Sequence, residues 1–168
     1  MSIKIRKEQP SDIQGIYDVT VAAFLDAPHT DHTEQFIVNA LRKSGALSLS
    51  LVAEENGSII GHIALSPVTI SDGTEGWYGL GPVSVVPGKQ GKGVGSMLIN
   101  AAMQELKHAK AQGCVLLGEP GYYHRFGFKA QQGLVLEGVP ADYFQALVLQ
   151  GDLPQGSVTY HRAFSAKG

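Results

Sequence analysis

VSVVPGKQGKGVGSMLI, residues 83–99, is the stretch of this 168-residue chain that decides its fold. It opens with an apolar strand, which Pro87 ends because proline has no N–H to donate to a sheet. Four of the next eight residues, 88–95, are glycines, and a helix leaves this loop with a buried stripe that includes Val94 and Leu98. A helix that starts in this way presents about four unpaired backbone N–H groups and a partial positive charge. We therefore predict that the loop binds an anion, a phosphate group in particular.

Two well-known phosphate-binding motifs do not fit this loop. A Walker A loop needs a lysine directly after its second glycine, where this chain has Val94. The dinucleotide-binding fingerprint is G-x-G-x-x-G, whereas Gly91, Gly93 and Gly95 are spaced as G-x-G-x-G, and no acidic residue follows at about 20 positions. The sequence therefore disfavours a P-loop nucleotidase and a Rossmann enzyme. A flexible glycine turn that binds no ligand is the alternative interpretation.

The residues before the loop predict an α/β (α+β) arrangement. Residues 3–7 alternate apolar and basic side chains, as in a half-buried strand. Two helices follow: one opens at Pro10 and Ser11, and the second starts behind a capping box formed by Asp31 and Glu34. Residues 47–86 contain three apolar strands joined by turns, the first at an Asn-Gly pair, which predicts an antiparallel meander.

The residues after the helix predict a second, buried part of the sheet. Residues 114–118, CVLLG, form a continuous apolar run, typical of a strand buried on both faces and parallel to the strand before the loop. We expect one helical turn and a strand from Gly127, a mixed segment at 134–149, and a last strand at 157–164. Because the chain contains no linker or internal repeat, we expect a single domain over residues 1–168.

The composition excludes several classes of protein. Apolar residues make up 43% and charged residues 17%, as in a globular domain rather than a disordered chain. A net charge of −2 argues against sequence-independent nucleic-acid binding. Cys114 is the only cysteine, which excludes an internal disulfide and a cysteine-based zinc site, and its buried pattern predicts a structural thiol. With no signal peptide and no run of ~18 apolar residues, we expect a cytoplasmic protein with no membrane partner and no metal.

The chain resembles the GNAT superfamily of acyl-CoA-dependent N-acetyltransferases through two motifs in order. The first is an apolar strand, a proline and [QR]-x-x-G-x-[GA], whose positions are held by Gln90, Gly93 and Gly95. The second, aromatic-Tyr-x-x-x-Gly-Phe, occurs at 122–128 as YYHRFGF, within a segment similar to a bacterial subgroup with an LLGEP-x-YY-x-RFGF-type sequence. The resemblance implies a mixed, mainly antiparallel sheet of about six or seven strands, flanked by helices, with splayed central strands.

The resemblance also implies a binding site for acetyl-CoA. The pyrophosphate would bind the amides of the glycine loop, and the strand before the loop would pair with the pantetheine. The amide of Val83 would polarise the thioester carbonyl, as in an oxyanion hole. Tyr123 would be the general acid for the CoA thiolate, with a purely structural aromatic cluster as the alternative, and Phe126 would line the CoA channel. The expected cofactor-binding residues are Val83, Ser84, Val85, Gln90, Gly91, Lys92, Gly93, Val94, Gly95, Ser96, Tyr123 and Phe126.

The general base is the open part of this prediction. An alkyl amine with a pKa of ~10.4 is neutral in only about one molecule in 10³ at pH 7, so a base or a water chain must remove a proton. Some family members place a glutamate on the strand that carries Val83, but this strand has no carboxylate. Glu119, at the end of the neighbouring strand, is the candidate, and a simple turn residue before Pro120 is the alternative.

We expect direct transfer of an acetyl group from acetyl-CoA to a primary amine, on a small molecule or a protein. The resemblance also implies a homodimer, since dimers are frequent in the family. The first two helices and residues 134–155 should shape the acceptor site. His29, Asp31 and His32 are candidates to contact the acceptor, although a surface loop is the alternative. The rival function is a non-catalytic acyl-CoA-binding or sensing module, which the missing strand carboxylate favours and Tyr123 opposes.

Overall fold

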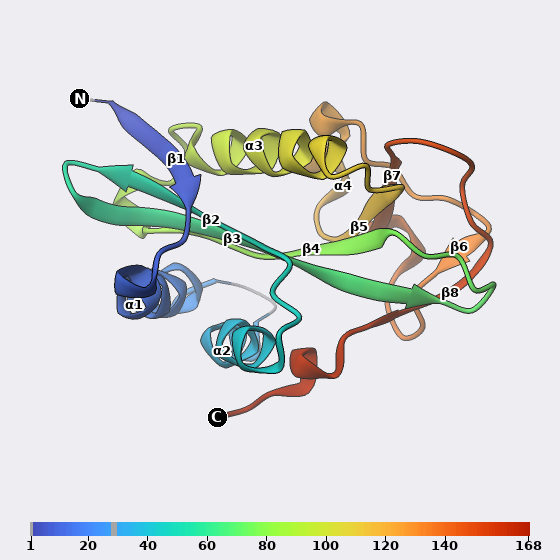
Figure 1. Cartoon of the computed structure of the whole chain (residues 1–168), viewed down its shortest axis with the longest axis horizontal. Helices are drawn as coiled ribbons and strands as arrows, with labels where there is room; N and C mark the ends of the chain where they lie inside the picture. Colours follow the sequence, from blue (N-terminus) through green and yellow to red (C-terminus); the bar gives the residue numbers. More distant parts are fainter. Residues whose placement is uncertain (1, 28–29) are drawn as a thin grey trace.

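A mixed, mainly antiparallel sheet separates two layers of helices in this computed structural model, which describes residues 2–27 and 30–168. Figure 1 shows α3 on one face of the sheet and α1 and α2 on the other. The sheet has eight strands, and six of them follow the order β1-β2-β3-β4-β5-β7. The predicted fold class is therefore confirmed, with slightly more strands than expected. Within the described part of the chain, no helix is long and apolar enough to cross a membrane.

The first half of the chain supplies the long antiparallel strands. It contains β1 (Ile3–Lys7), η1 (Pro10–Asp12), α1 (Ile13–Phe24), α2 (Glu34–Ser44), β2 (Leu49–Glu55), β3 (Ser58–Ile70) and β4 (Trp77–Val85). The predicted hairpin turn is present between β2 and β3, where Asn56 and Gly57 both have positive φ. β2, β3 and β4 pair antiparallel in sequence order, so the predicted meander is confirmed.

The second half completes the sheet and carries the shorter elements. It contains η2 (Pro87–Lys89), α3 (Val94–His108), β5 (Gly113–Leu117), α4 (Pro120–Tyr123), η3 (His124–Phe126), β6 (Leu134–Val135), η4 (Ala141–Tyr143), β7 (Phe144–Val148), β8 (Gly156–Tyr160) and η5 (Arg162–Ser165). β5 runs parallel to β4, as predicted. β8 pairs with β3 and β6 and leads the chain back toward α2.

Two strand predictions near the C-terminus were wrong. The strand expected at 157–164 ends at Tyr160, because His161 starts a 3₁₀ turn and accepts the N–H of Ala163 at Nδ1 (3.0 Å). The strand expected from Gly127 is reduced to a single bridge between Lys129 and Ala146, since Gly127 ends η3 with a φ of 93°. The strand next to β5 is instead β7, within the segment whose sequence pattern was mixed.

The core forms on both faces of the sheet because each helix is amphipathic. On one face, Leu98 and Leu106 of α3 pack into a large cluster with Ile63 of β3. On the other face, Ile16 of α1 and Val38 of α2 pack on β2. Burial of each such aliphatic side chain contributes about 1.5–3 kcal/mol. The helices are therefore fixed to the sheet, and the loop before α3 is held at the end of β4.

β4 separates from β5 after a short stretch of pairing. The two strands pair only from Trp77 to Gly79 on the β4 side. Further along β4, Leu80 pairs with Leu65 and Val83 with Ile63, so β4 has one more residue than β3 between these two pairs. This is a β-bulge, which bends a strand and is frequent beside functional sites. The second half of β4 therefore has an unpaired edge.

Candidate active site

The glycine loop ends in a helix start that no side chain caps. Gly91 and Gly93 have φ values of 77° and 87°, which glycine adopts without strain, and Gly93 is the N-cap of α3. Since a glycine has no capping side chain, the amides of Val94, Gly95 and Ser96 have neither a capping acceptor nor an intrahelical one. The space beside Gly91 and Gly93 is open. These backbone amides and the open space beside them suit an anion, as the sequence predicts.

Side chains of the loop tie it to the sheet. Gln90 donates its Nε2 to the carbonyl oxygen of Val85 (3.0 Å), so its side chain fastens the loop to the end of β4. Lys89 pairs with Glu55 of β2, with 2.7 Å between Nζ and Oε1. Lys92 is exposed and forms no ion pair within the described part of the chain. Of the two lysines near the predicted anion site, Lys92 is therefore the one with an unpaired charge.

The unpaired edge of β4 presents backbone groups of Val83 and Val85. The N–H of Val86 donates to Ile60 of β3 (2.9 Å). Because neighbouring residues of a strand direct their backbone groups to opposite edges, Ser84 and Val86 face β3, and Val83 and Val85 face away from it. Gln90 already occupies the carbonyl of Val85. The N–H and C=O of Val83 and the N–H of Val85 thus line the gap between β4 and β5.

Tyr122 lies over the first turn of α3. Its hydroxyl is 3.3 Å from Oγ of Ser96, and a Cβ added to Gly95 would be 3.4 Å from the same hydroxyl. Arg125 covers the other side of the ring at 4.6 Å and donates its Nε to the carbonyl of Tyr122 (3.0 Å). Tyr122 therefore joins α4 to the helix start that the sequence predicts for pyrophosphate.

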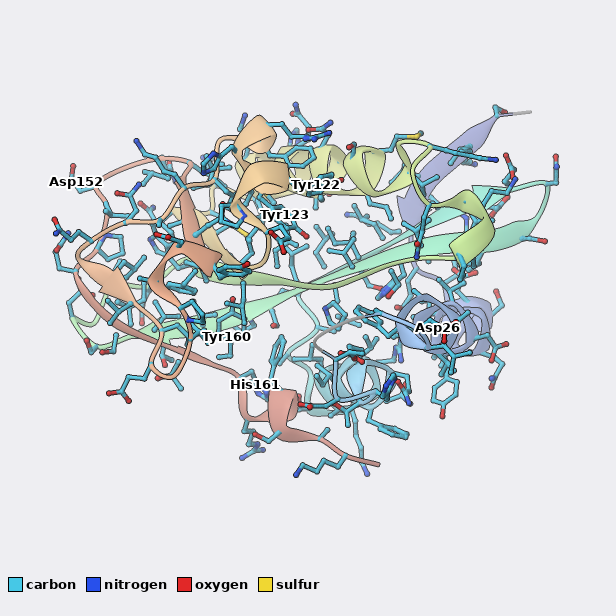
Figure 2. The ribbon with its side chains drawn as sticks, turned by 180° about the vertical axis from the view of Figure 1, so that it is seen from behind. Asp26, Tyr122, Tyr123, Asp152, Tyr160 and His161 are labelled. Carbon is cyan, nitrogen blue, oxygen red and sulfur yellow. The ribbon has the colours of Figure 1, made fainter. Side chains whose placement is uncertain are left out.

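Tyr123 is packed more deeply than Tyr122, and it lines a cavity between β4 and β5 instead of lying over the start of α3. Its ring makes edge contacts with Tyr122 (centroids 4.9 Å apart) and Phe128 (6.3 Å). Figure 2 shows both tyrosines together on the α3 side of the sheet. Burial, with a smaller effect of Tyr122, raises the pKa of Tyr123 to about 12. The phenol is thus protonated at neutral pH, as a general acid must be.

A cavity of about 510 Å³ lies where β4 and β5 separate. Val83 and Tyr123 line it on one side, and it extends to α2, Tyr160 of β8 and the C-terminal turn η5. Its walls are mostly apolar, and its charged lining residues are Glu34 and Glu137. In Figure 2, Tyr160 lies on the opposite side of the sheet from Tyr123, so the cavity joins the two faces at the separated strands. The apolar walls include Phe24, Ile37, Leu80, Leu116, Leu136 and Phe164.

The other predicted site residues are spread around this cavity. Ser84 is buried and its Oγ has no hydrogen-bond partner among the described residues. The side chain of Val94 is in the core, so only its backbone faces the loop. Phe126 is half-buried beside Tyr122, with their ring centroids 5.5 Å apart. Cys114 is fully buried, and burial raises the pKa of its thiol, which fits a structural role.

Glu119, the predicted base, lies outside the cavity lining. Its side chain is exposed, and its carbonyl accepts the N–H groups of Tyr122 and Tyr123 (3.2 Å each), which starts α4. Asp31 and His32 are exposed and do not line the cavity, and His29 is outside the described residues. Within residues 2–27 and 30–168, no group of three or more His, Cys, Asp or Glu side chains is placed to hold a metal.

Sequence reasoning missed the two carboxylates that line the cavity, Glu34 and Glu137. It assigned Glu34 to a capping box with Asp31, but Thr33 is the N-cap, Glu34 is the first residue of α2, and its Oε2 accepts from Oγ1 of Thr30 (2.5 Å). Tyr160 was also missed: it lies in a predicted strand whose pattern does not mark a cavity residue, and Glu137 lies in the mixed segment 134–149. A glutamate in the first helical turn is common for electrostatic reasons, so its position carried no signal of function.

Comparison with known families identifies the class of this protein. Residues 4–130 match the family described as acetyltransferase (GNAT) domain. The uncharacterized N-acetyltransferase YhbS of Escherichia coli (strain K12) is 34% identical over 126 residues, which cover 74% of this chain and 72% of YhbS. The N-acetyltransferase YjhQ of the same strain, also uncharacterized, is 31% identical over 135 residues, 79% of this chain and 72% of YjhQ. The chain belongs to the GNAT acetyltransferase family, as the two motifs indicated.

Two solved structures are similar over almost the whole chain. A GNAT family acetyltransferase from Brucella melitensis, in complex with acetyl-CoA, is 52% identical, with a TM-score of 0.87 and coverage of 97% of this chain and 98% of that one. YhbS from Escherichia coli, in complex with CoA, is 30% identical, with a TM-score of 0.86 and coverage of 99% and 93%. The similarity thus includes the C-terminal part, residues 131–168, that the family match leaves out.

Proposed function

We propose that this enzyme transfers the acetyl group of acetyl-CoA directly to a primary amine. The observation that carries the proposal is that the unpaired backbone of Val83 and the protonated phenol of Tyr123 line one cavity beside the anion-binding loop. Similar chains were crystallised with acetyl-CoA or CoA, which supports the choice of co-substrate.

The residues of this chain fit acetyl-CoA in two places. The uncapped amides of Val94, Gly95 and Ser96, with Lys92 nearby, suit a pyrophosphate. The unpaired groups of Val83 and Val85 suit the amides of a pantetheine arm, which would pair with β4 like an added strand. Acetyl-CoA would supply an activated acetyl thioester between these two places.

Each proton in the transfer then has a place to go. The Val83 N–H would donate to the thioester carbonyl oxygen as negative charge develops there, a contact whose loss typically costs about 3–4 kcal/mol. The amine nitrogen forms a bond to the carbonyl carbon, the carbon–sulfur bond breaks, and Tyr123 gives its proton to the sulfur. Counted from its ammonium form, the amine loses two protons in total: one leaves to solvent, through Glu119 or a water chain, before the attack, and the other returns to Tyr123 after it.

Binding and turnover can be tested separately. Thermal unfolding with acetyl-CoA, CoA, ATP and NAD, each titrated alone, identifies the co-substrate, because a ligand at 100 times its Kd adds about 2.7 kcal/mol and raises Tm by a few degrees. Release of CoA thiol is then followed with a panel of amines, since the only cysteine of the enzyme is buried and gives little background. Absence of a shift at millimolar acetyl-CoA would overturn the proposal.

The rival function, an acyl-CoA sensor without turnover, is separated by one pair of variants. Tyr123→Phe should lower transfer strongly while CoA still binds, and Tyr122→Phe should weaken CoA binding more than it lowers kcat. If wild-type protein binds acetyl-CoA but releases no thiol with any amine, the sensor is the better account. A cytoplasmic location and a homodimer stay predictions of the sequence.

A further inference from the structure

We infer that the acceptor is an amine with an apolar body and no carboxylate group of its own, and that Glu34 binds its ammonium group. This inference rests on the acetyl transfer proposed above and specifies the acceptor of that same site. It is argued from the polar groups and the apolar walls of the cavity that Val83 and Tyr123 also line.

Glu34 has one oxygen that lacks a partner. Its Oε2 accepts from Thr30, but its Oε1 is buried and accepts no hydrogen bond from the described residues. A buried carboxylate oxygen without a donor is costly, and a ligand with N–H groups would satisfy it. Tyr160 lines the same cavity, and its hydroxyl is likewise buried and without a hydrogen-bond partner among the described residues. Two residues of one cavity lining thus each carry a buried polar atom without a hydrogen-bond partner among the described residues.

The charged residues around the cavity determine which sign of charge the ligand should carry. Glu34 and Glu137 are its charged lining residues, and no Lys, Arg or His of the described chain lines it. A cationic amine is attracted by this arrangement. An amino acid would bring a carboxylate into an apolar space with two negative side chains and no cation to pair with it, which disfavours its binding.

The apolar walls of the cavity indicate the chemical character of the rest of the acceptor. Phe24, Ile37 and Leu136 contribute apolar surface, and Tyr160 and Phe164 form an edge-to-face aromatic pair with centroids 4.9 Å apart. Contact of such a wall with an apolar group is favourable, and contact with a charged group that neither glutamate reaches is unfavourable. The cavity therefore favours an arylalkyl or branched alkyl amine over a polyamine, whose spaced charges would also lie against the apolar walls.

Part of the acceptor end of the cavity comes from residues that follow the family match. The family match ends at residue 130, whereas Leu136, Glu137, Tyr160 and Phe164 all follow it. Gly79 of β4 also makes room for this end, because a Cβ there would lie 2.8 Å from the ring of Tyr160. The acceptor side of the cavity is thus formed jointly by residues within the family match, Glu34 among them, and by the C-terminal segment.

A matched pair of amines tests the inference. 2-Phenylethylamine and phenylalanine differ only in the carboxylate, and ethylamine lacks the aromatic body. With saturating acetyl-CoA, we expect kcat/KM for 2-phenylethylamine to exceed that for each of the other two at least 100-fold. Direct binding of 2-phenylethylamine to the enzyme with CoA, measured by calorimetry, provides a readout that does not depend on turnover.

Glu34→Gln tests the binding group. We expect at least a tenfold rise in KM for 2-phenylethylamine and a matching loss in calorimetric affinity, with a smaller change in kcat. Glu75→Gln, which removes an exposed carboxylate from the β3–β4 turn, is the charge-matched control and should leave both values unchanged. An unchanged Kd for CoA shows that the Glu34 variant is folded.

The outcomes separate this inference from the function on which it rests. Thiol release that is as fast with phenylalanine, a polyamine or a lysine peptide, or a Glu34→Gln variant with wild-type KM, overturns the inference and leaves acetyl transfer intact. Absence of acetyl-CoA binding and of thiol release with every amine overturns the proposed function instead.

Discussion

The ring of Tyr123 lies against Gly118, and a Cβ added to Gly118 would come within 2.5 Å of Cε2 of that ring. Real Cβ atoms do not approach a neighbour so closely, so the ring has its position because residue 118 is a glycine. The glycine follows directly after β5, and its carbonyl accepts Nε2 of buried Gln145 (3.0 Å). The backbone beside Tyr123 is thus held in place, and the ring would have to move.

Gly118→Ala should therefore lower activity through the placement of Tyr123. A displacement of about 1 Å at a reacting group can cost about 100-fold in rate. We expect kcat to fall by about ten- to 100-fold, while the Kd for CoA stays close to the wild-type value. Gly121→Ala is the control, because no atom lies within 4 Å of a Cβ added there. A Gly118→Ala enzyme with wild-type kcat would show that the position of Tyr123 does not matter.

The pH dependence of kcat should report the raised pKa of Tyr123. A general acid works while it is protonated, so an unperturbed tyrosine would begin to fail near pH 10. Burial raises the pKa of Tyr123 to about 12. We expect kcat at saturating amine to rise as the amine deprotonates and to show no decline up to about pH 10.5. A falling limb with a midpoint near 10 would contradict this assignment.

Much of the fold could be predicted because local signals agreed with the tertiary structure. The Asn56–Gly57 turn fixed the register of β2 and β3, and Pro87 with the glycine loop marked the change from β4 to α3. The C-terminal segment was harder, because its strands are short and pair across long distances in sequence. Phe144–Val148 becomes a strand only because β5 offers it an edge.

On the co-substrate side the sequence pointed to individual residues, whereas on the acceptor side it indicated only segments, the first two helices and residues 134–155. Loop amides and strand edges are backbone features that glycines and a proline specify locally. Glu34, Tyr160 and Glu137 meet only after folding, since they lie on α2, at the end of β8 and in the loop after β6. No spacing in the sequence relates them, so only the structure places them at one cavity.

The two lysines of the glycine loop should differ in their effect on CoA binding. Lys92 has an unpaired charge, whereas the charge of Lys89 is engaged by Glu55. An exposed charge pair contributes about 0.2–1 kcal/mol, which is at most about fivefold in affinity. We expect Lys92→Ala to raise the Kd for CoA two- to fivefold at low salt, and less at high salt because ions screen the contact. Equal effects of Lys92→Ala and Lys89→Ala, measured by calorimetry, would contradict this division.

His62 should make the stability of the enzyme depend on pH between about 4 and 6.5. The side chain is fully buried in β3, with Nε2 2.8 Å from Oγ of Ser50, which donates to Glu8, the partner of Arg42. Burial lowers the pKa of His62 to about 4, against an attraction from Glu8 and with a further lowering by Arg42. As pH falls, His62 takes up its proton in the unfolded chain before it does so in the folded protein. The contribution of neutral His62 to the stability of the folded protein is therefore complete above pH 6.5 and is lost as pH falls toward 4.

The size of this effect is up to about 3 kcal/mol, at 1.36 kcal/mol for each pH unit between the two pKa values. The free energy of unfolding of the wild type, measured with urea, should therefore fall steeply as pH is lowered from 6.5 to 4.5. His62→Gln cannot take up the proton and should remove most of that slope, although it is less stable at pH 7. Burial raises the pKa of Glu8, but hydrogen bonds from Arg42 and Ser50 outweigh it and lower that pKa below its usual value. A hydrogen bond from Arg6 likewise lowers the pKa of Asp12, against burial. These two carboxylates therefore lose their contribution to stability only at lower pH than His62 does. A His62→Gln variant that keeps the wild-type slope above pH 4.5 would assign the effect to another group.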